Sequence, residues 1–312
     1  MKTVARISLL LCFIAALCTC DRAPMTVFTR LAPRETGVDF TNQTGESDSF
    51  NILTNEYIYN GGGVGIGDFN QDGLSDLFFT GCATENRLYL NRGDLRFEDA
   101  TEVAGIGGGD RWNNGVTVVD VNGDGLEDIY VCATTKEEAA LRANQLFLNQ
   151  GPNADGLPTF IDLAPEYGIA DTTHNTQAAW LDYDRDGDLD LFLLVNEMVD
   201  SKRPNDFSRK VQDGSGRRTD KLYRQDRVGD KISFTEVGKE TGILFQGFAL
   251  AVSVCDFNRD GWPDLYVSND YLSNDLAYLN TARPDGSRYF VDIAADITKH
   301  TSYSAMGNDV AD

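Results

Sequence analysis

Asp68-Phe-Asn-Gln-Asp-Gly-Leu-Ser-Asp76 is the first of four copies of one acidic loop in this chain of 312 residues. The other copies are Asp120-Val-Asn-Gly-Asp-Gly-Leu-Glu-Asp128, Asp182-Tyr-Asp-Arg-Asp-Gly-Asp-Leu-Asp190 and Asp256-Phe-Asn-Arg-Asp-Gly-Trp-Pro-Asp264. Each copy has an oxygen-bearing side chain at positions 1, 3, 5 and 9 and a glycine at position 6. Oxygen ligands around a sharp glycine turn are what a hard cation such as calcium requires. Four matches in one chain are not a chance occurrence.

The four loops belong to a larger repeated unit of four short strands. A stretch rich in small residues precedes each loop, an apolar strand follows it, and two further strands complete the unit. In the first unit these segments are 61–67, 77–79, 86–91 and 97–99. Repetition of such units predicts a β-propeller, in which neighbouring blades cover one another's sheet faces. The expected fold is all-β, with four complete four-stranded blades and an incomplete ring.

These residues resemble the FG-GAP/VCBS repeat family, whose blades carry a calcium loop between their first two strands. The resemblance extends from about Phe28 to the last residue. The stretch Asn55-Glu-Tyr-Ile-Tyr-Asn-Gly-Gly-Gly-Val-Gly-Ile-Gly-Asp68 is similar to the start of the propeller in large bacterial exported proteins of the ASPIC/UnbV and cartilage acidic protein group. No ASPIC/UnbV module is visible in this sequence. The resemblance implies Ca²⁺ as the cofactor, in about four sites.

The expected metal ligands are the side chains at positions 1, 3, 5 and 9 of each loop and the backbone carbonyl of position 7. They are Asp68, Asn70, Asp72, Leu74 and Asp76; Asp120, Asn122, Asp124, Leu126 and Asp128; Asp182, Asp184, Asp186, Asp188 and Asp190; and Asp256, Asn258, Asp260, Trp262 and Asp264.

Two other kinds of acidic loop fit the sequence less well. An EF-hand needs an acidic residue at position 12 and flanking helices, whereas position 12 here falls inside an apolar strand. A solvated acidic turn without metal would leave its carboxylates repelling one another. The third loop has Asp184 where the others have asparagine, so we expect it to bind calcium most tightly. Magnesium is a weaker fit, because it retains more water.

The first nineteen residues have the pattern of a targeting segment. Lys2 and Arg6 form a basic region before an apolar run, 7–17, that is too short to span a bilayer. The following Cys18-Thr19-Cys20 resembles a bacterial lipoprotein signal with Cys20 as the lipidated residue. We therefore expect a signal peptide at 1–19, a propeller at 20–312, and a lipid anchor on Cys20 in the cell envelope. An ordinary cleaved secretory peptide is the alternative.

Both ends of the propeller region have the pattern of partial units. The stretch 307–312 aligns with the inner strand of a fifth unit, and Asp312 falls on its first ligand position. The stretches 27–29 and 36–38 resemble a closing strand and its exit turn without a blade before them. We expect a fragment of a propeller whose fifth repeat is truncated at residue 312.

A second group of residues recurs eight positions before each loop. It consists of Asn60, Trp112, His174 and Phe248, with Arg111 beside Trp112. This offset places them where the inner strands begin, near one mouth of the central channel. Aromatic and amide side chains there could bind a sugar or a peptide, and packing at the rim is the alternative.

The charge and the motifs limit the possible functions. The formal charge of −22 argues against nucleic-acid binding, which needs a basic face. No nucleophile elbow, histidine-bearing triad or redox-cofactor motif is visible. The sequence therefore predicts a non-enzymatic, exported calcium-binding scaffold for a protein or glycan at the cell surface. The alternative is a polysaccharide-active or dehydrogenase-like propeller enzyme, with its site at the channel mouth or beyond residue 312.

Overall fold

The computed structural model describes residues 27–197, 210–271, 273–302 and 304–311. The chain divides into two compact units, Met1–Thr36 and Gly37–Asp312. The described part of the first unit contains the short helix α2 (Pro33–Thr36). The signal peptide expected at 1–19 and the acceptor Cys20 lie outside the described residues and stay predictions.

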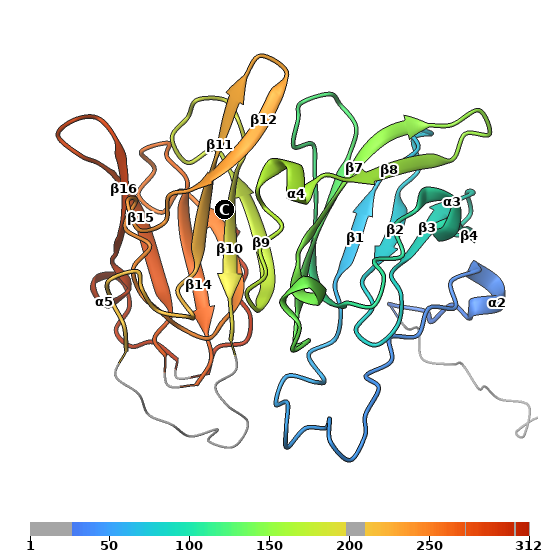
Figure 1. Ribbon diagram of the computed structural model, residues 1–312, viewed down its shortest axis with the longest axis horizontal. Coiled ribbons are helices and arrows are strands. Elements are labelled where there is room, and N and C mark those ends of the chain that lie inside the picture. Colours follow the sequence, from blue (N-terminus) through green and yellow to red (C-terminus); the bar gives the residue numbers. More distant parts are fainter. Residues whose placement is uncertain (1–26, 198–209, 272, 303, 312) are drawn as a thin grey trace, which may run out of the picture. The chain divides into compact units, whose positions relative to one another are not determined.

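The second unit contains four antiparallel sheets of four strands each (Figure 1). Blade 1 consists of β1 (Val64–Gly67), β2 (Asp76–Phe79), β3 (Arg87–Asn91) and β4 (Phe97–Asp99), and blade 2 of β5 (Trp112–Val119), β6 (Asp128–Thr134), β7 (Gln145–Pro152) and β8 (Pro158–Asp162). Blade 3 consists of β9 (Asn175–Leu181), β10 (Asp190–Val195), β11 (Lys221–Val228) and β12 (Lys231–Glu236), and blade 4 of β13 (Ala249–Cys255), β14 (Asp264–Asn269), β15 (Leu276–Ala282) and β16 (Arg288–Asp292). The strands of each blade pair in chain order. The prediction of an all-β fold with four-stranded blades is confirmed.

Apolar cores lie between consecutive blades. Phe78 and Ile129 belong to the core between blades 1 and 2, and Tyr130 and Leu191 to the core between blades 2 and 3. A third core joins blades 3 and 4. Each fully buried side chain of this size contributes about 1.5–3 kcal/mol relative to an exposed one. A single blade could not bury both of its faces, so each blade depends on its neighbours for stability.

The inner strands approach one another closely enough to require glycine. A Cβ on Gly63 would lie 2.9 Å from the backbone nitrogen of Val116 in blade 2. A Cβ on Gly115 would lie 2.4 Å from the backbone oxygen of Thr176 in blade 3. The small residues that precede each loop are therefore explained by crowding at the axis, as the sequence predicts.

Short helical turns end the blades. These are α3 (Thr101–Ala104), α4 (Ala164–Tyr167) and α5 (Ala294–Ile297), whereas the 3₁₀ helix η1 (Ala139–Arg142) lies between β6 and β7. Blade 3 ends in an exit turn at Gly242, where φ is +92° and a Cβ would lie 2.3 Å from the Phe290 carbonyl oxygen. Gly37 repeats this arrangement against the Phe97 carbonyl oxygen, with φ +83°. The predicted exit turn at 36–38 is therefore present.

The expected partial strands at the two ends do not form. Residues 27–29 are in no strand, and Val27 and Phe28 are almost fully exposed. Residues 307–311 are also in no strand, although the Asn308 amide donates to Ala251 O at 3.2 Å along β13. A strand needs the ladder of a second strand, and none of the described residues supplies one to either segment. Asp312 lies outside the described residues.

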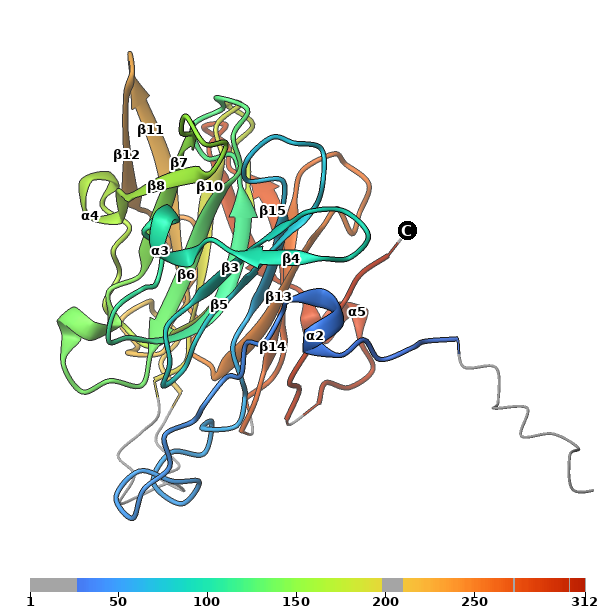
Figure 2. The ribbon, with the colours of Figure 1, turned by 90° about the vertical axis from the view of Figure 1, so that its right-hand side faces the viewer.

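The segment before β1 reaches blade 4. The Tyr57 hydroxyl donates to Asp270 at 3.1 Å, and the rings of Tyr57 and Tyr271 meet edge to face at 5.9 Å. Figure 2 turns the structure so that blades 1 and 2 face the viewer.

Among the described residues, no helix has the length and apolar character needed to cross a membrane.

Candidate metal loops and a channel mouth

The four acidic loops share one backbone conformation. Position 6 is a glycine in the left-handed region in every copy, with φ between +83° and +95°. Position 4 is also left-handed, although only the second loop has a glycine there. The other three loops hold Gln71, Arg185 and Arg259 at φ of about 60°. The repeated geometry shows that one local structure recurs, in which glycine at position 6 avoids strain.

The first, third and fifth side chains are drawn together inside each loop. In the first loop, the two Asp68 oxygens accept from the backbone nitrogens of Asp72 at 3.0 Å and Gly73 at 2.8 Å. Asn70 donates its amide to Asp72 at 3.0 Å, and Asp72 accepts from Leu74 N at 2.9 Å. The second and fourth loops repeat this pattern. The oxygens that would hold a cation are therefore gathered by the loop's own backbone.

The aspartate at position 9 is fully buried in all four loops and joins each loop to its sheet. Asp128 accepts from Val121 N in its own loop at 3.1 Å and from Asn149 N on β7 at 2.8 Å. Asp76, Asp190 and Asp264 make the corresponding two bonds. These bonds give the position-9 aspartate a structural role that does not depend on metal, which sequence reasoning did not foresee.

These buried carboxylates are costly to ionise. Burial raises the pKa of Asp76 to about 6, of Asp128 to about 7 and of Asp190 to about 8, even though the backbone N–H groups act in the opposite direction. Neighbouring loop carboxylates raise these pKa values further. A divalent cation beside them would favour the ionised form.

The third loop has the clearest cation geometry. One carboxylate oxygen from each of Asp182, Asp184 and Asp190 lies within 4.8 Å of the others. The Oδ1 of Asp184 is buried and accepts no hydrogen bond. A buried carboxylate oxygen without a donor is an acceptor that a cation would satisfy. The residues present therefore fit an oxygen-coordinated divalent ion, and Asp184, the departure from asparagine at position 3, creates the unsatisfied oxygen.

A side-chain amide at the fifth residue of the third strand of blades 2, 3 and 4 connects the acidic loop of its own blade to the loop of the preceding blade. Asn149 donates to Glu127 O in its own blade at 3.1 Å and to Phe69 O in the first loop at 2.9 Å. Asn280 makes the same pair of bonds, to Pro263 O at 3.2 Å and to Tyr183 O at 2.8 Å. Gln225 makes the equivalent pair when its amide nitrogen faces the carbonyls of Leu189 and Val121. We call Asn149, Gln225 and Asn280 the bridging amides; their spacing was visible in the repeat, but their role was not.

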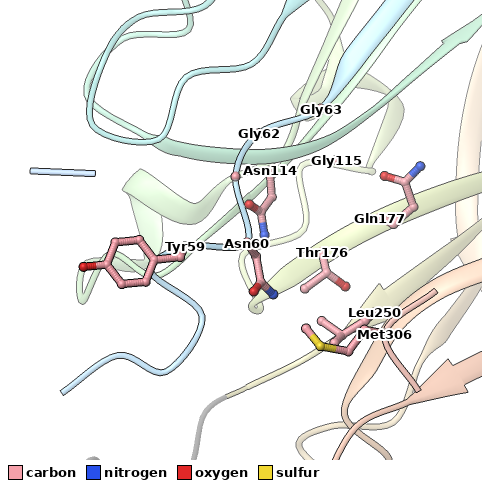
Figure 3. A pocket seen from close by; sticks show the side chains of 11 residues that line it. Tyr59, Asn60, Gly62, Gly63, Asn114, Gly115, Thr176, Gln177, Leu250 and Met306 are labelled. Carbon is pink, nitrogen blue, oxygen red and sulfur yellow. The ribbon is translucent and has the colours of Figure 1, made fainter. Parts of the chain in front are cut away.

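The four inner strands converge on a cavity of about 440 Å³ (Figure 3). Its lining comes from β5, β9 and β13 of blades 2, 3 and 4, from the segment 59–63 before β1, and from Met306. The lining residues are Tyr59, Asn60, Gly61, Gly62, Gly63, Asn114, Gly115, Thr176, Gln177, Leu250 and Met306. No charged side chain lines it, although the chain carries 49 acidic residues. The channel mouth is therefore a neutral site of amides, a hydroxyl, a phenol and exposed glycine backbone.

Of the residues expected at the mouth, Asn60 lines this cavity. The side chain of Arg111 donates to the carbonyls of Ala143 at 3.1 Å and Gly108 at 2.9 Å. Trp112 is buried edge to face against Phe50. His174 accepts from Thr135 N at 3.2 Å, and burial lowers its pKa to about 4, so the ring is neutral.

Phe248, the remaining member, has Arg218 4.1 Å above its ring and Tyr271 at its edge. The structure thus places Arg111, Trp112, His174 and Phe248 in packing and turn contacts. Thr176 and Gln177, which the sequence reasoning missed, stand at the cavity beside Asn60 (Figure 3). They lie two and three residues after His174 in the chain, so the predicted offset was correct to within three residues.

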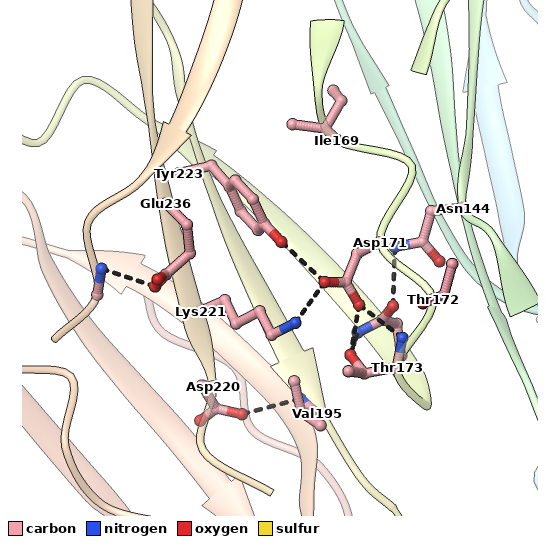
Figure 4. Close-up of polar contacts among 12 residues, drawn as sticks. Asn144, Ile169, Asp171, Thr172, Thr173, Val195, Asp220, Lys221, Tyr223 and Glu236 are labelled. Atoms are coloured by element: carbon pink, nitrogen blue, oxygen red, sulfur yellow. Dashed lines mark hydrogen bonds and ion pairs between the residues drawn. The ribbon is translucent and has the colours of Figure 1, made fainter. Parts of the chain in front are cut away.

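A buried ionic cluster lies where blade 2 passes into blade 3 (Figure 4). Asp171 accepts from Lys221, from the Tyr223 hydroxyl at 2.8 Å and from Thr173 N at 2.8 Å. The backbone oxygen of Asp171 accepts from Asn144 N of blade 2 at 3.0 Å. Every partner is structural, so this cluster joins blades and offers no open ligand position.

Comparison with known proteins identifies the repeat. The FG-GAP-like repeat family matches residues 68–131, from the first ligand of loop 1 to β6. The FG-GAP repeat family matches residues 248–282, which contain the fourth loop with β13, β14 and β15. These two segments of the chain are FG-GAP repeats. The first match therefore contains the first two acidic loops and the second match contains the fourth, each within the unit that the structure repeats.

The chain is also similar to cartilage acidic protein 1. It is 29% identical over 213 residues to the Homo sapiens protein, an alignment that covers 68% of this chain and 28% of that relative. It is 28% identical over 210 residues to the Mus musculus protein, covering 67% of this chain and 29% of the relative. The aligned part therefore spans less than a third of the length of these relatives. The prediction of an FG-GAP repeat chain related to the cartilage acidic protein group is confirmed.

Proposed function

We propose that this chain is a calcium-binding FG-GAP propeller that acts, outside the cell, as a non-enzymatic scaffold for a protein or glycan. One observation carries the metal part. Oxygens of Asp182, Asp184 and Asp190 lie within 4.8 Å of one another, and the buried Oδ1 of Asp184 lacks a donor. The similarity to the FG-GAP repeats supports the same assignment for the other three loops.

Calcium suits these loops better than magnesium. Calcium accepts six to eight oxygen ligands in flexible geometry, whereas magnesium demands a strict octahedron and keeps several waters. Each loop offers side chains at positions 1, 3, 5 and 9, with the carbonyl of position 7 as a further ligand. The bound ion would supply positive charge against carboxylates such as Asp190, whose pKa burial raises to about 8.

Calorimetric unfolding with calcium and with chelator tests the metal assignment. A ligand that binds only the folded state stabilises it by about 2.7 kcal/mol per site at a free concentration of 100 Kd. We expect calcium to raise the unfolding midpoint strongly, and magnesium at the same concentration to raise it much less. An unchanged midpoint on chelation would refute the calcium proposal.

The channel mouth supports the scaffold part of the proposal. The amides of Asn60, Asn114 and Gln177 and the Thr176 hydroxyl can exchange hydrogen bonds with sugar hydroxyls or peptide groups. Tyr59 at the rim is 58% exposed and offers an aromatic face. The lipid anchor on Cys20 that the sequence suggests would hold this mouth at the cell surface; secretion is the alternative.

A panel of immobilised glycans and peptides tests the mouth. We expect Gln177→Ala to lose binding and Gln150→Ala, an exposed amide on β7, to retain it. Equal binding by the two variants would place the recognition surface elsewhere.

A further inference from the structure

A second cavity, of about 240 Å³, lies between blades 3 and 4. Three arginines line it: Arg224 on β11, and Arg283 and Arg288 on either side of the turn from β15 to β16. Tyr183 and Trp262, from the third and fourth acidic loops, complete the apolar part of the wall. The cavity is therefore lined by residues of the third and fourth acidic loops, of β11 and of the β15–β16 hairpin.

The arginines are unusual in so acidic a chain. The sequence has 49 acidic and 27 basic residues, so most guanidinium groups should find a carboxylate. Only Arg224 of the three does so, with Asp226 at 2.8 Å. Within the described residues, Arg283 and Arg288 have no carboxylate within 4.0 Å. Two guanidinium groups without a carboxylate in direct contact thus face one cavity, and the nearby carboxylates of Asp260, Asp264 and Asp285 act on them only at longer range.

Aromatic rings and backbone oxygens hold these two guanidinium groups in place. Arg288 lies 3.8 Å above the Trp262 ring and donates to the Asn280 side chain at 2.9 Å and its carbonyl at 2.6 Å. Arg283 lies 4.3 Å above the Tyr289 ring and donates to Glu240 O at 2.6 Å. A guanidinium group has five N–H donors, so both arginines keep donors for a ligand. Their positions are fixed before any ligand arrives, which lowers the entropic cost of binding.

Two carboxylates also line the cavity, and one of them is a proposed calcium ligand. Glu240 is exposed, whereas Asp184 is partly buried and belongs to the third loop. An unneutralised Asp184 carboxylate would repel an anion in the cavity. A calcium ion on Asp184 would remove that repulsion, so anion binding and calcium binding should strengthen each other.

We propose that this cavity binds an oxyanion group, of the sulfate type, through Arg283, Arg288 and Arg224. Guanidinium groups pair with two oxygens of such an anion at once, which gives both affinity and orientation. The anion can be free sulfate or a sulfate group carried on a sugar. The dependence on calcium rests on the proposed function; the arginine site itself does not.

Titration with sodium sulfate tests the site, with ionic strength held constant by sodium chloride. Tryptophan fluorescence is a suitable signal, because Arg288 stacks on Trp262 and would shift on binding. In calcium, we expect a saturable change in the wild-type chain and an affinity at least about tenfold weaker in Arg283→Gln, since a hydrogen bond to a charged group contributes about 1.5–3 kcal/mol. Arg283→Lys, which keeps the charge but loses the fork, should fall between them.

The matched control is Arg259→Gln. Arg259 is exposed in the fourth loop and does not line the cavity, so this variant removes one positive charge nearby without touching the site. We expect its sulfate affinity to stay within about twofold of wild type, because exposed charges are strongly screened. No saturable change in the wild type, or equal weakening in Arg259→Gln and Arg283→Gln, would overturn the proposal.

Two further arms separate the source of the anion and the role of calcium. N-acetylglucosamine 6-sulfate should bind more tightly than inorganic sulfate if the anion is carried on a sugar, and no more tightly if it is free; unsulfated N-acetylglucosamine is the blank. In chelator, sulfate should bind more weakly but still require Arg283. Equal affinity in calcium and chelator would refute the coupling through Asp184, whereas failure of calcium to raise the unfolding midpoint would refute the proposed metal function separately.

Discussion

At the residue scale, the third loop differs from its three relatives by one functional group. In the first, second and fourth loops the asparagine at position 3 donates to the aspartate at position 5, at 2.8–3.0 Å. Asp184 cannot make this bond, and its Oδ1 is buried without a donor. Burial and the neighbouring Asp186 raise the pKa of Asp184. We therefore expect this loop to be the most destabilised of the four without a cation and the best suited to bind one.

The effect of Asp184→Asn on the free energy of unfolding should have opposite signs in chelator and in calcium. In chelator we expect it to raise the free energy of unfolding by about 1 kcal/mol, because the new amide donates to Asp186 and a poorly solvated charge is removed. In calcium the same variant should be less stable than wild type, since it loses an anionic ligand. Urea unfolding in both conditions measures this.

Asn122→Asp is the reciprocal control in the second loop. It removes the hydrogen bond of 2.8 Å that the Asn122 side-chain amide donates to Asp124, and it adds a negative charge. It should lower stability in chelator and increase the stabilisation by calcium. If both variants shift stability in the same direction in calcium and in chelator, position 3 is not a metal ligand.

At the element scale, two carboxylates near the start of β11, those of Asp171 and Asp220, have pKa values shifted in opposite directions (Figure 4). Burial alone would raise the pKa of Asp171, but Lys221 and Thr173 outweigh it and hold that pKa below its ordinary value. Asp220 is fully buried with one backbone donor, Val195 N at 2.9 Å, and burial raises its pKa to about 8. One carboxylate is stabilised as the ion and the other as the acid.

The two aspartates should therefore affect stability in opposite pH ranges. Asp171, whose pKa is lowered on folding, contributes stability above its unfolded pKa of about 3.9, and this is lost as the pH falls through the folded value. Asp220, whose pKa is raised, contributes stability that is full below about pH 3.9 and is lost as the pH rises toward about 8.

Two variants check these signs by urea unfolding across pH. Asp171→Asn should lower the free energy of unfolding at pH 8 by about 1–3 kcal/mol, with the deficit shrinking below pH 4. Asp220→Asn keeps an acceptor for Val195 N–H and cannot ionise, so it should be more stable than wild type at pH 8 and similar at pH 4. A pH-independent difference in either variant would contradict the assignment.

At the scale of the whole molecule, hydrogen bonds connect the acidic loops of successive blades. Each bridging amide spans a loop carbonyl of its own blade and one of the preceding blade, so three successive blade interfaces carry the same bond. Among the described residues, the side-chain amide of Asn91, the equivalent residue of blade 1, donates only within its own blade, to Ser75 O at 2.9 Å. This difference isolates the contribution of the bond between blades.

Asn149→Ala should therefore destabilise the chain more than Asn91→Ala. Both side chains also accept from the backbone nitrogen two residues on, at 2.9 Å in Asn149 and 3.0 Å in Asn91. The variants differ in the bond to Phe69 O and in burial, so we expect Asn149→Ala to cost about 1–3 kcal/mol more, by chemical unfolding at fixed calcium. Equal losses would mean that the bond between blades contributes nothing measurable.

Much of this architecture could be predicted from the repeat alone. The acidic loops mark where the first strand of a blade turns into the second, and the apolar segments around them mark the other strands. In the first unit, for example, β1 to β4 fall on the expected segments 61–67, 77–79, 86–91 and 97–99. The partial strands at 27–29 and 307–311 were wrong, because a strand depends on a pairing partner and not on its own sequence. The mouth residues were misplaced by a few positions, since the sequence does not show which way a side chain faces at the end of a strand.

The amino-acid sequence by itself determined the blade, its acidic loop and the residue types a calcium ion would need, because these are local and repeat in register. Only the tertiary structure decided what lies between blades. The bridging amides, the neutral mouth and the cavity of Arg224, Arg283 and Arg288 all join residues of different blades that are far apart in the chain. Their hydrogen bonds and charges depend on how one blade faces the next, and a local pattern carries no record of that packing.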